Sequence, residues 1–164
     1  MSPPAKVSVS VLMVCLGNIC RSPTAEGVFR SRVQAAGLSS HIRVDSAGTS
    51  NWHVGEPPDG RSIRAAAQRR YDLSRQRARQ VSFSDFEEFD YILAMDSMNL
   101  RELHMRCPET MQHKLGLMLS YGDTGKSEVP DPYDGGHDGF ELVLDLLESA
   151  CDDLLMRIRK DLAL

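Results

Sequence analysis

The feature that most restricts the fold is an alternation of short apolar segments with longer segments of helical periodicity. The short segments are bounded by polar residues, glycine or proline, which is typical of buried strands. They cover residues 7–14, 42–46, 91–94 and 114–119. Helices are predicted over residues 23–36, 61–71 and 96–106 and from residue 140 onward. Strands that alternate with helices favour a parallel sheet covered on both faces.

Single residues mark where these helices begin and end. Pro23 suits the first position of a helix, and Gly37 follows the last apolar position of the same segment. Asp96 is a good N-cap for a later helix, which Pro108 ends. The first predicted strand runs directly into the loop that begins with Cys15, and ligands of such sheets bind beyond the carboxyl ends of the strands.

Length and hydropathy limit the class of protein. A chain of 164 residues suits one domain with one core. No apolar run approaches the roughly 20 residues that a membrane span needs, so we expect no membrane association. Residues 1–6 contain two prolines and one lysine and lack the apolar stretch of a secretory signal. We therefore expect a disordered lead-in over 1–6, a folded domain over 7–164 and a cytoplasmic location.

Charges are segregated along the chain, although the formal net charge is only −4. Seven arginines lie between residues 61 and 79, where Asp72 is the only acid. Nine acids, with no Lys or Arg, lie between residues 128 and 153. Two solvated faces are the simpler interpretation, and a basic rim that attracts an anionic substrate is the sharper one. A net acidic chain with scattered aromatics does not predict a nucleic-acid partner.

Four cysteines occur at positions 15, 20, 107 and 151. They form no C-x-x-C pair, so a structural zinc site is not predicted. A chain of this length buries a core without disulfides, and a cytosolic setting keeps thiols reduced. We therefore expect each cysteine to be either buried and inert or chemically active, and we expect no metal or other cofactor.

The strongest chemical signal is a loop between the first predicted strand and a helix that opens with proline. Its sequence is Cys15-Leu16-Gly17-Asn18-Ile19-Cys20-Arg21-Ser22. A loop of this size can curl so that its backbone N–H groups point inward and bind an oxyanion such as phosphate. The helix N-terminus adds free N–H groups and partial positive charge. Gly17 and Asn18 are the residues best able to adopt left-handed backbone angles there.

The two ends of this loop suit attack on a phosphoryl group. The thiolate is the nucleophilic form of cysteine, and a helix N-terminus with a nearby arginine favours that form at neutral pH. Cys15 is therefore the candidate nucleophile. The planar fork of Arg21 can bind two phosphoryl oxygens and stabilise their charge. Ser22 either caps the helix or donates a hydrogen bond to the thiolate.

Such chemistry also needs a general acid for the leaving group. Asp131 is the best candidate, because it follows the last predicted strand in the loop Val129-Pro130-Asp131-Pro132-Tyr133. The prolines on both sides fix its backbone, and we expect them to keep the carboxyl group partly dry. An ordinary turn aspartate is the alternative, since Asp-Pro is common in turns.

Several motifs occur together, in order, along nearly the whole chain. They are Val14 to Pro23, Ala25-Glu26, Asp45-Ser46-Ala47-Gly48-Thr49, Ala78-Arg79-Gln80, Tyr91-Ile92-Leu93-Ala94-Met95-Asp96 and Asp131-Pro132-Tyr133. In sequence and spacing this set resembles the low-molecular-weight protein tyrosine phosphatases. The resemblance implies a three-layer, single-domain α/β fold, in which a four-stranded parallel sheet has helices on both faces. It also implies hydrolysis of phosphotyrosine through a cysteinyl-phosphate, with tyrosine-phosphorylated proteins as partners.

The resemblance implies roles for individual residues. Cys15 matches the nucleophile, Arg21 the phosphate clamp, and Asp131 the acid that then serves as base for the hydrolytic water. Asn18 and Ser46 resemble the residues that hold the loop in shape.

Four further residues match family positions around the loop. Ser22 resembles the thiolate donor. Cys20 resembles a neighbour that forms a reversible disulfide with the nucleophile, although a plain buried cysteine is the alternative. Trp52 and Tyr133 resemble the residues that flank an aryl phosphate, and a tryptophan packed on the core is the alternative for Trp52.

Two positions depart from the family pattern. Gln76 stands where many relatives carry a histidine near the carboxylates that match Glu26 and Asp45, so a network built on histidine is not expected. Asp134 stands where several relatives carry a second tyrosine that can be phosphorylated, which argues against that form of regulation.

Other activities fit these residues less well. Ile19 occupies a position where a phosphoarginine-specific relative has threonine, and its apolar side chain suits a phenyl ring better. A thioredoxin-coupled arsenate reductase needs two further cysteines close in sequence, whereas Cys107 and Cys151 lie far apart. Residues 125–127 end like a nucleotide-binding motif but lack its first glycine. A non-enzymatic binding module remains if Asp131 does not reach the cleft. We expect a monomer.

Overall fold

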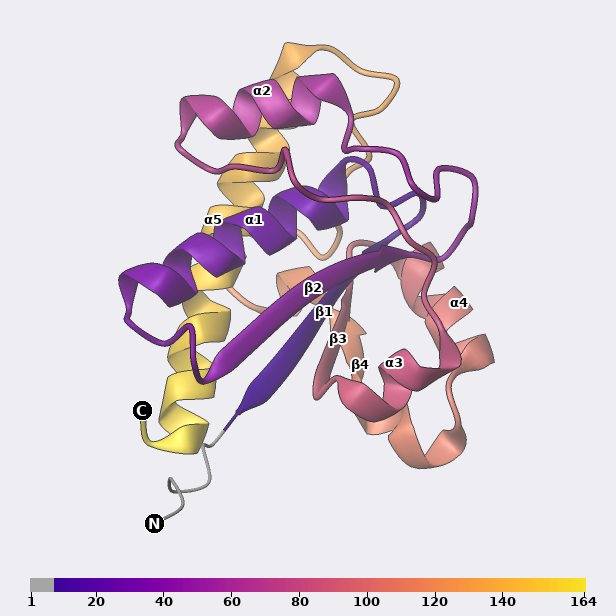
Figure 1. Cartoon of the computed structure of the whole chain (residues 1–164), viewed down its shortest axis with the longest axis vertical. Helices are drawn as coiled ribbons and strands as arrows, with labels where there is room; N and C mark the ends of the chain where they lie inside the picture. The colour runs from indigo at the N-terminus through magenta and orange to yellow at the C-terminus, as the bar shows by residue number, and fades with distance from the viewer. Residues whose placement is uncertain (1–7) are drawn as a thin grey trace.

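A four-stranded parallel sheet lies at the centre of the molecule in a computed structural model that describes residues 8–164 (Figure 1). The strands are β1 (Val9–Cys15), β2 (Ile42–Gly48), β3 (Tyr91–Ala94) and β4 (Leu115–Leu117), in the order β2-β1-β3-β4. Every pairing is parallel. The expected lead-in over residues 1–6, and the expected strand start at position 7, lie outside the described residues.

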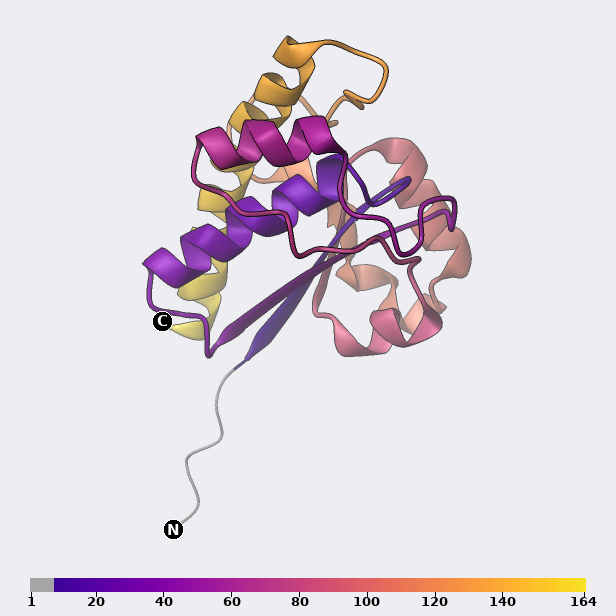
Figure 2. The same cartoon turned by 45° about the horizontal axis from the view of Figure 1, so that its top comes forward.

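Helices cover both faces of the sheet and make three layers (Figures 1 and 2). One face carries α1 (Arg21–Ala35) and α5 (His137–Leu162), and α2 (Gly60–Gln68) packs against α5. The other face carries α3 (Phe83–Glu88) and α4 (Ser97–Arg106). The predicted fold class, a parallel sheet with helices on both faces, is therefore confirmed. Within residues 8–164, no helix has the length and apolar character needed to cross a membrane.

Strand β1 separates two hydrophobic cores because its side chains alternate between the faces of the sheet. Val11 and Met13 belong to the core under α1 and α5. Leu12 and Val14 belong to the core on the side of α3 and α4. All four side chains are fully buried, which explains why this segment is apolar throughout rather than alternating.

One predicted helix and one predicted strand are longer than the observed elements. Helix α2 ends at Gln68 rather than at Tyr71, because Arg70 adopts a positive φ of 69°, which a right-handed helix does not allow. Strand β4 has three residues rather than six, because 3₁₀ helices flank it on both sides. These are η1 (Glu109–Lys114) and η2 (Met118–Ser120).

Two helices begin earlier than predicted, and a third was not predicted. Helix α1 begins at Arg21, so Pro23 is its third residue, and the loop runs into the helix without a side-chain cap. Helix α5 begins at His137 rather than at Phe140. Helix α3 was not expected, although Ser82 and Asp85 form a reciprocal capping box at its start.

The segregated charges meet across the packed helices. Arg69, from the arginine-rich stretch, makes ion pairs with Glu141, Asp145 and Glu148 of α5 at 2.7–2.9 Å. The basic and acidic stretches are therefore partners at this point rather than two separate solvated faces.

Strand register gathers the carboxyl ends at one edge of the sheet. Cys15 lies opposite Gly48, and Val14 lies opposite Ala94. The loops that follow β1, β2 and β3 therefore begin side by side, at the edge where ligands of such sheets bind.

Candidate active site

A cleft of about 150 Å³ opens at this edge of the sheet. Its lining residues are Cys15, Leu16, Gly17, Ile19, Cys20, Arg21, Trp52, His53, Asp131 and Tyr133. The structure thus brings the predicted nucleophile, phosphate clamp and general acid to one cleft, together with both predicted aromatic residues. The supporting residues Asn18, Ser22 and Ser46 lie buried behind the loop rather than on its surface.

A left-handed backbone angle was predicted at Gly17 and Asn18, in the loop between β1 and α1, and it occurs at Asn18 alone. Asn18 has a φ of 58°, in the left-handed region. Gly17 has no positive φ, so the expectation for it was wrong. Glycine avoids a close contact at this position instead. A Cβ atom here would lie 3.0 Å from Cδ2 of His53, which also lines the cleft.

Two donor groups face the sulfur of Cys15. The backbone N–H of Asn18 donates to Sγ over 3.3 Å, and the hydroxyl of Ser22 lies 3.0 Å from it. Asn18 Nδ2 donates to the same hydroxyl oxygen over 2.8 Å, so the hydroxyl proton points either to the sulfur or to the carbonyl oxygen of Ala47, 3.5 Å away. The side chain of Ser22 therefore faces Cys15, and no side-chain hydrogen bond caps α1.

Asn18 is the centre of a buried hydrogen-bond network behind the loop. Its Nδ2 group donates to Ser22 and, over 2.9 Å, to the hydroxyl of Ser46. Its Oδ1 atom accepts from the backbone N–H of Arg79 over 3.0 Å. Ser46 in turn donates to Glu26 over 2.7 Å. These hydrogen bonds stabilise the left-handed backbone angle of Asn18, because they fix both the nitrogen and the oxygen of its side-chain amide.

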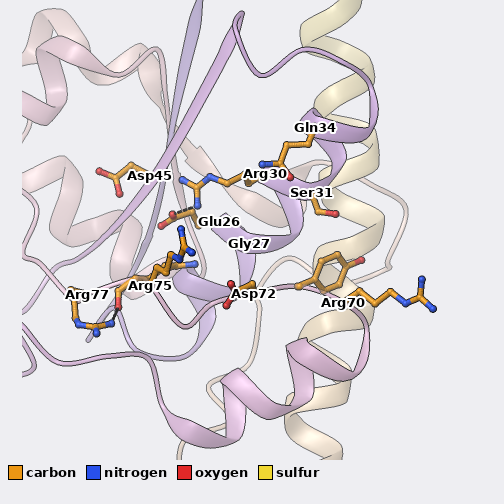
Figure 3. Close-up of a pocket in the computed structure, with 12 residues that line it drawn as sticks. Glu26, Gly27, Arg30, Ser31, Gln34, Asp45, Arg70, Asp72, Arg75 and Arg77 are labelled. Carbon is orange, nitrogen blue, oxygen red and sulfur yellow. Dashed lines mark hydrogen bonds and ion pairs between the residues drawn. The ribbon is translucent and has the colours of Figure 1, made fainter.

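Beyond this network lies a second cavity of about 600 Å³, shown in Figure 3. Glu26 and Arg30 form an ion pair of 2.6 Å on its wall, where the two side chains point toward each other. Burial raises the pKa of Glu26, and the bonds from Ser46 and Arg30 offset only part of that rise. Gln76, in the position of the usual histidine, donates instead to the carbonyl of Pro23 over 3.0 Å. No side chain at this position therefore titrates near neutral pH.

Arg21 is held by two carboxylates and a carbonyl. Its NH1 group donates to Asp96 over 2.7 Å and to the carbonyl of Val129 over 3.0 Å. Its NH2 group lies 3.7 Å from Asp131. Burial lowers the pKa of Arg21, but its interactions with Cys15, Asp96 and Asp131 outweigh burial and raise that pKa above its usual value. The guanidinium is therefore a fixed positive charge beside Cys15.

Asp96 is a site residue that the sequence reasoning assigned only to a helix cap. One carboxylate oxygen accepts from the backbone N–H of Asn99 over 2.7 Å, which caps α4 as predicted. The other oxygen binds Arg21. The same side chain therefore joins the start of α4 to Arg21, the predicted phosphate clamp. Its place at the end of the motif over residues 91–96 was the available signal.

Asp131 reaches the cleft, but its carboxylate is not dry. One oxygen accepts from the backbone N–H of Tyr133 over 3.1 Å, and the other faces Arg21. The side chain is 48% exposed, contrary to the expectation that the prolines would shield it. Pro132 is itself buried and fixes the backbone, so the prolines orient Asp131 without covering it.

Two exposed aromatic residues form the rim of the cleft. Trp52 is 69% exposed, so it is not packed on the core, and Tyr133 is 46% exposed. Arg61 lies over the ring of Tyr133, 5.6 Å from its centre, and donates to its carbonyl oxygen. Arg61 thus brings one charge of the arginine-rich stretch to this rim. His53 was missed, because a single histidine in a loop gives no distinctive pattern.

The four cysteines are free thiols. Burial raises the pKa of Cys20 to about 12. Burial also raises the pKa of Cys151. Both groups are therefore neutral thiols at physiological pH, although Cys20 lines the same cleft as Cys15. Among residues 8–164, no cluster of three or more His, Cys, Asp or Glu side chains is placed to hold a metal ion.

Gly48 supports the loop by leaving room for its backbone. A Cβ atom at this position would lie 2.7 Å from the carbonyl oxygen of Leu16, a contact that only a shift of the backbone relieves. We expect Gly48→Ala to lower kcat about tenfold and to destabilise the fold by about 1–3 kcal/mol. Steady-state kinetics and thermal unfolding measure the two effects. Gly116→Ala is the matched control, because its Cβ meets Leu93 at an ordinary 3.8 Å; equal losses in both variants would contradict this role of Gly48.

Known proteins of similar sequence and structure come from one family. The family model described as low molecular weight phosphotyrosine protein phosphatase matches residues 10–164. A low molecular weight protein-tyrosine-phosphatase of Streptomyces coelicolor is 45% identical, over 92% of this chain and 93% of that protein. A protein tyrosine phosphatase of Entamoeba histolytica, solved with Hepes in its active site, superposes with a TM-score of 0.91 at 44% identity, covering 94% of this chain and 99% of that one. Wzb of Vibrio vulnificus, solved with benzylphosphonate, superposes with a TM-score of 0.81 at 27% identity, covering 92% and 99%. The chain belongs to the low molecular weight phosphotyrosine protein phosphatase family.

Proposed function

We propose that this enzyme hydrolyses phosphotyrosine through a cysteinyl-phosphate formed on Cys15. The observation that carries the proposal is the convergence of Cys15, Arg21 and Asp131 on one cleft. A sulfur atom that faces an N–H donor and a hydroxyl, beside a fixed guanidinium, suits a thiolate nucleophile.

The reaction proceeds in two displacements at phosphorus. The Cys15 thiolate attacks, the P–O bond to the tyrosyl group breaks, and Asp131 gives its proton to the leaving phenolate oxygen. Asp131, now a carboxylate, then takes a proton from water as that water attacks phosphorus and the P–S bond breaks. Inorganic phosphate leaves, and the thiolate and the protonated acid are restored.

The loop supplies charge stabilisation rather than covalent chemistry. Backbone N–H groups of residues 16–20, the start of α1 and the fork of Arg21 bind the three equatorial oxygens of the transferring group. Asn18 and Ser46 keep the loop in this shape through their shared hydrogen bonds. We assign Ser22 to the thiolate, since its hydroxyl lies 3.0 Å from the sulfur.

The walls of the cleft support an aromatic leaving group. Ile19 lies within the loop, and Trp52 and Tyr133 form the rim. A phenyl ring between such side chains gains apolar and stacking contacts that a guanidinium substrate gains less well. The benzylphosphonate complex of Vibrio vulnificus Wzb supports this choice, because that ligand joins a phosphonate to an aromatic ring.

Partners and location form part of the same proposal. An exposed rim around a shallow cleft suits phosphotyrosine carried on a protein, so tyrosine-phosphorylated proteins are the proposed substrates. The free thiols of all four cysteines suit a reducing compartment, which supports a cytoplasmic enzyme. A reversible disulfide between Cys15 and Cys20 remains a proposal that rests on their common place in the loop.

Rapid quenching with a ³²P-labelled aryl phosphate tests the chemistry, and a pair of peptides tests the substrate. We expect a burst of labelled phosphoenzyme, because a P–S bond forms before water attacks. We also expect kcat/KM for a phosphotyrosine peptide to exceed that for the matched phosphoarginine peptide by about 100-fold. Turnover without a phosphoenzyme would contradict the covalent step, and faster release from phosphoarginine would contradict the substrate assignment.

A further inference from the structure

A groove of about 390 Å³ lies next to the catalytic cleft and shares two of its walls, Leu16 and Trp52. Residues 49–52 form one side of the groove, and the exposed face of α4 forms the other. We propose that this groove binds the part of a substrate protein adjacent to phosphotyrosine, and that Arg101 selects an acidic side chain there. This inference rests on the proposed function, because it names the sequence context of the same substrate.

Continuity with the cleft is the first reason. Leu16 and Trp52 line both the cleft and the groove, so the two cavities are neighbours. A peptide whose phosphotyrosine enters the cleft therefore leaves it over these two residues and runs toward α4. The start of α4 is also fixed to the phosphate clamp, because Asp96 both caps this helix and binds Arg21.

The apolar lining of the groove is the second reason. Met98 is 74% exposed at the start of α4 and lines the groove together with Trp52 and Leu16. A flexible methionine and an aromatic side chain are the residue types enriched where one protein meets another. Three large apolar side chains gathered in one groove thus suit a peptide, whereas single exposed hydrophobic residues need no explanation.

The charge of the groove indicates which peptide fits. Arg106 pairs with Glu102 over 3.2 Å. Arg101 makes no ion pair with any carboxylate among residues 8–164, and it lies exposed on the same wall. An unpaired guanidinium at the edge of an apolar groove favours an aspartate or glutamate of the peptide.

Charge reversal at Arg101 tests the inference. The substrates are phosphotyrosine peptides that carry either acidic or basic residues at the flanking positions, and p-nitrophenyl phosphate, which is too small to reach the groove. We expect wild type to prefer the acidic peptides. We expect Arg101→Glu to lower kcat/KM for them about fivefold, to raise it for the basic peptides, and to leave p-nitrophenyl phosphate unchanged. The difference should shrink as salt is added, because the contact is exposed.

Arg64→Glu is the matched control, since it makes the same charge change at an exposed residue of α2 that lines neither the cleft nor the groove. A flank preference that Arg101→Glu does not alter, or one that Arg64→Glu alters equally, would overturn the inference while leaving the proposed function intact. An equal loss toward p-nitrophenyl phosphate would likewise overturn it. Failure of wild type to hydrolyse any of these substrates would instead contradict the proposed function.

Discussion

Cys15→Ser is expected to lower phosphatase turnover by about 10⁴-fold or more, while the variant still binds a phosphotyrosine peptide. A serine hydroxyl is nearly isosteric with the thiol but is not ionised at neutral pH, so the attacking group is lost. The groups that we propose to bind the phosphate, namely the loop N–H groups and Arg21, are unchanged. The N–H of Asn18 and the hydroxyl of Ser22 can bond the new oxygen as they face the sulfur.

Three measurements check this result. Steady-state turnover gives the loss, quenched labelling shows whether phosphoenzyme forms, and calorimetry with a phosphotyrosine peptide shows whether binding survives. Cys107→Ser is the control, because Cys107 lies outside the cleft and its Sγ atom donates only to the adjacent carbonyl of Pro108. We expect that variant to keep wild-type turnover. More than about 1% residual activity in Cys15→Ser would contradict Cys15 as the nucleophile.

The unit from β1 through the loop to α1 was predictable from local sequence. A buried strand has a recognisable composition, and the spacing from Cys15 to Arg21 has meaning only at a strand end followed by a helix start. Both conditions are local, because they depend on residues within one continuous stretch. The resemblance to a known family then supplied Asp131, which spacing alone did not separate from an ordinary turn aspartate.

The contacts that hold the loop were not predictable from local sequence. Arg21 binds Asp96 across 75 positions, and Arg79 reaches Asn18 across 61 positions. Such pairs depend on the strand order β2-β1-β3-β4 and on the register that sets the carboxyl ends level. Sequence periodicity predicts which face of a strand is buried, but not which loops meet beyond its end.

Local features of the structure explain why the other predictions were wrong. Helix α3 has six residues, which is too short for a clear periodic signal. Its capping box, formed by Ser82 and Asp85, is the local sequence feature that predicts a helix start there. The shortened α2 depends on a left-handed angle at Arg70, which sequence rarely predicts for a residue other than glycine or asparagine. Asp131 is exposed because the neighbouring prolines fix its backbone but do not cover its carboxylate.

Asp131→Asn is expected to lower kcat for phosphotyrosine by about 10²–10³-fold, within the range usual for loss of a general acid. The amide keeps the geometry, because its oxygen can still accept from the backbone N–H of Tyr133. It cannot protonate the tyrosyl oxygen, and the unprotonated phenolate is a poor leaving group because the pKa of tyrosine is about 10. The phosphorylation step should suffer much less with p-nitrophenyl phosphate, whose leaving group needs little help from a proton.

Rapid-mixing measurements of phosphoenzyme formation with both substrates separate this effect from a loss of binding or folding. A misfolded loop would slow both substrates equally, whereas loss of an acid slows the poorer leaving group more. Asp134→Asn is the matched control, since it makes the same change at an exposed residue of the same loop that does not line the cleft. Because Asp131 is also the proposed base for water, hydrolysis of the phosphoenzyme should slow with either substrate. Unchanged rates for both steps would remove Asp131 from the mechanism and leave water or another carboxylate as the proton donor.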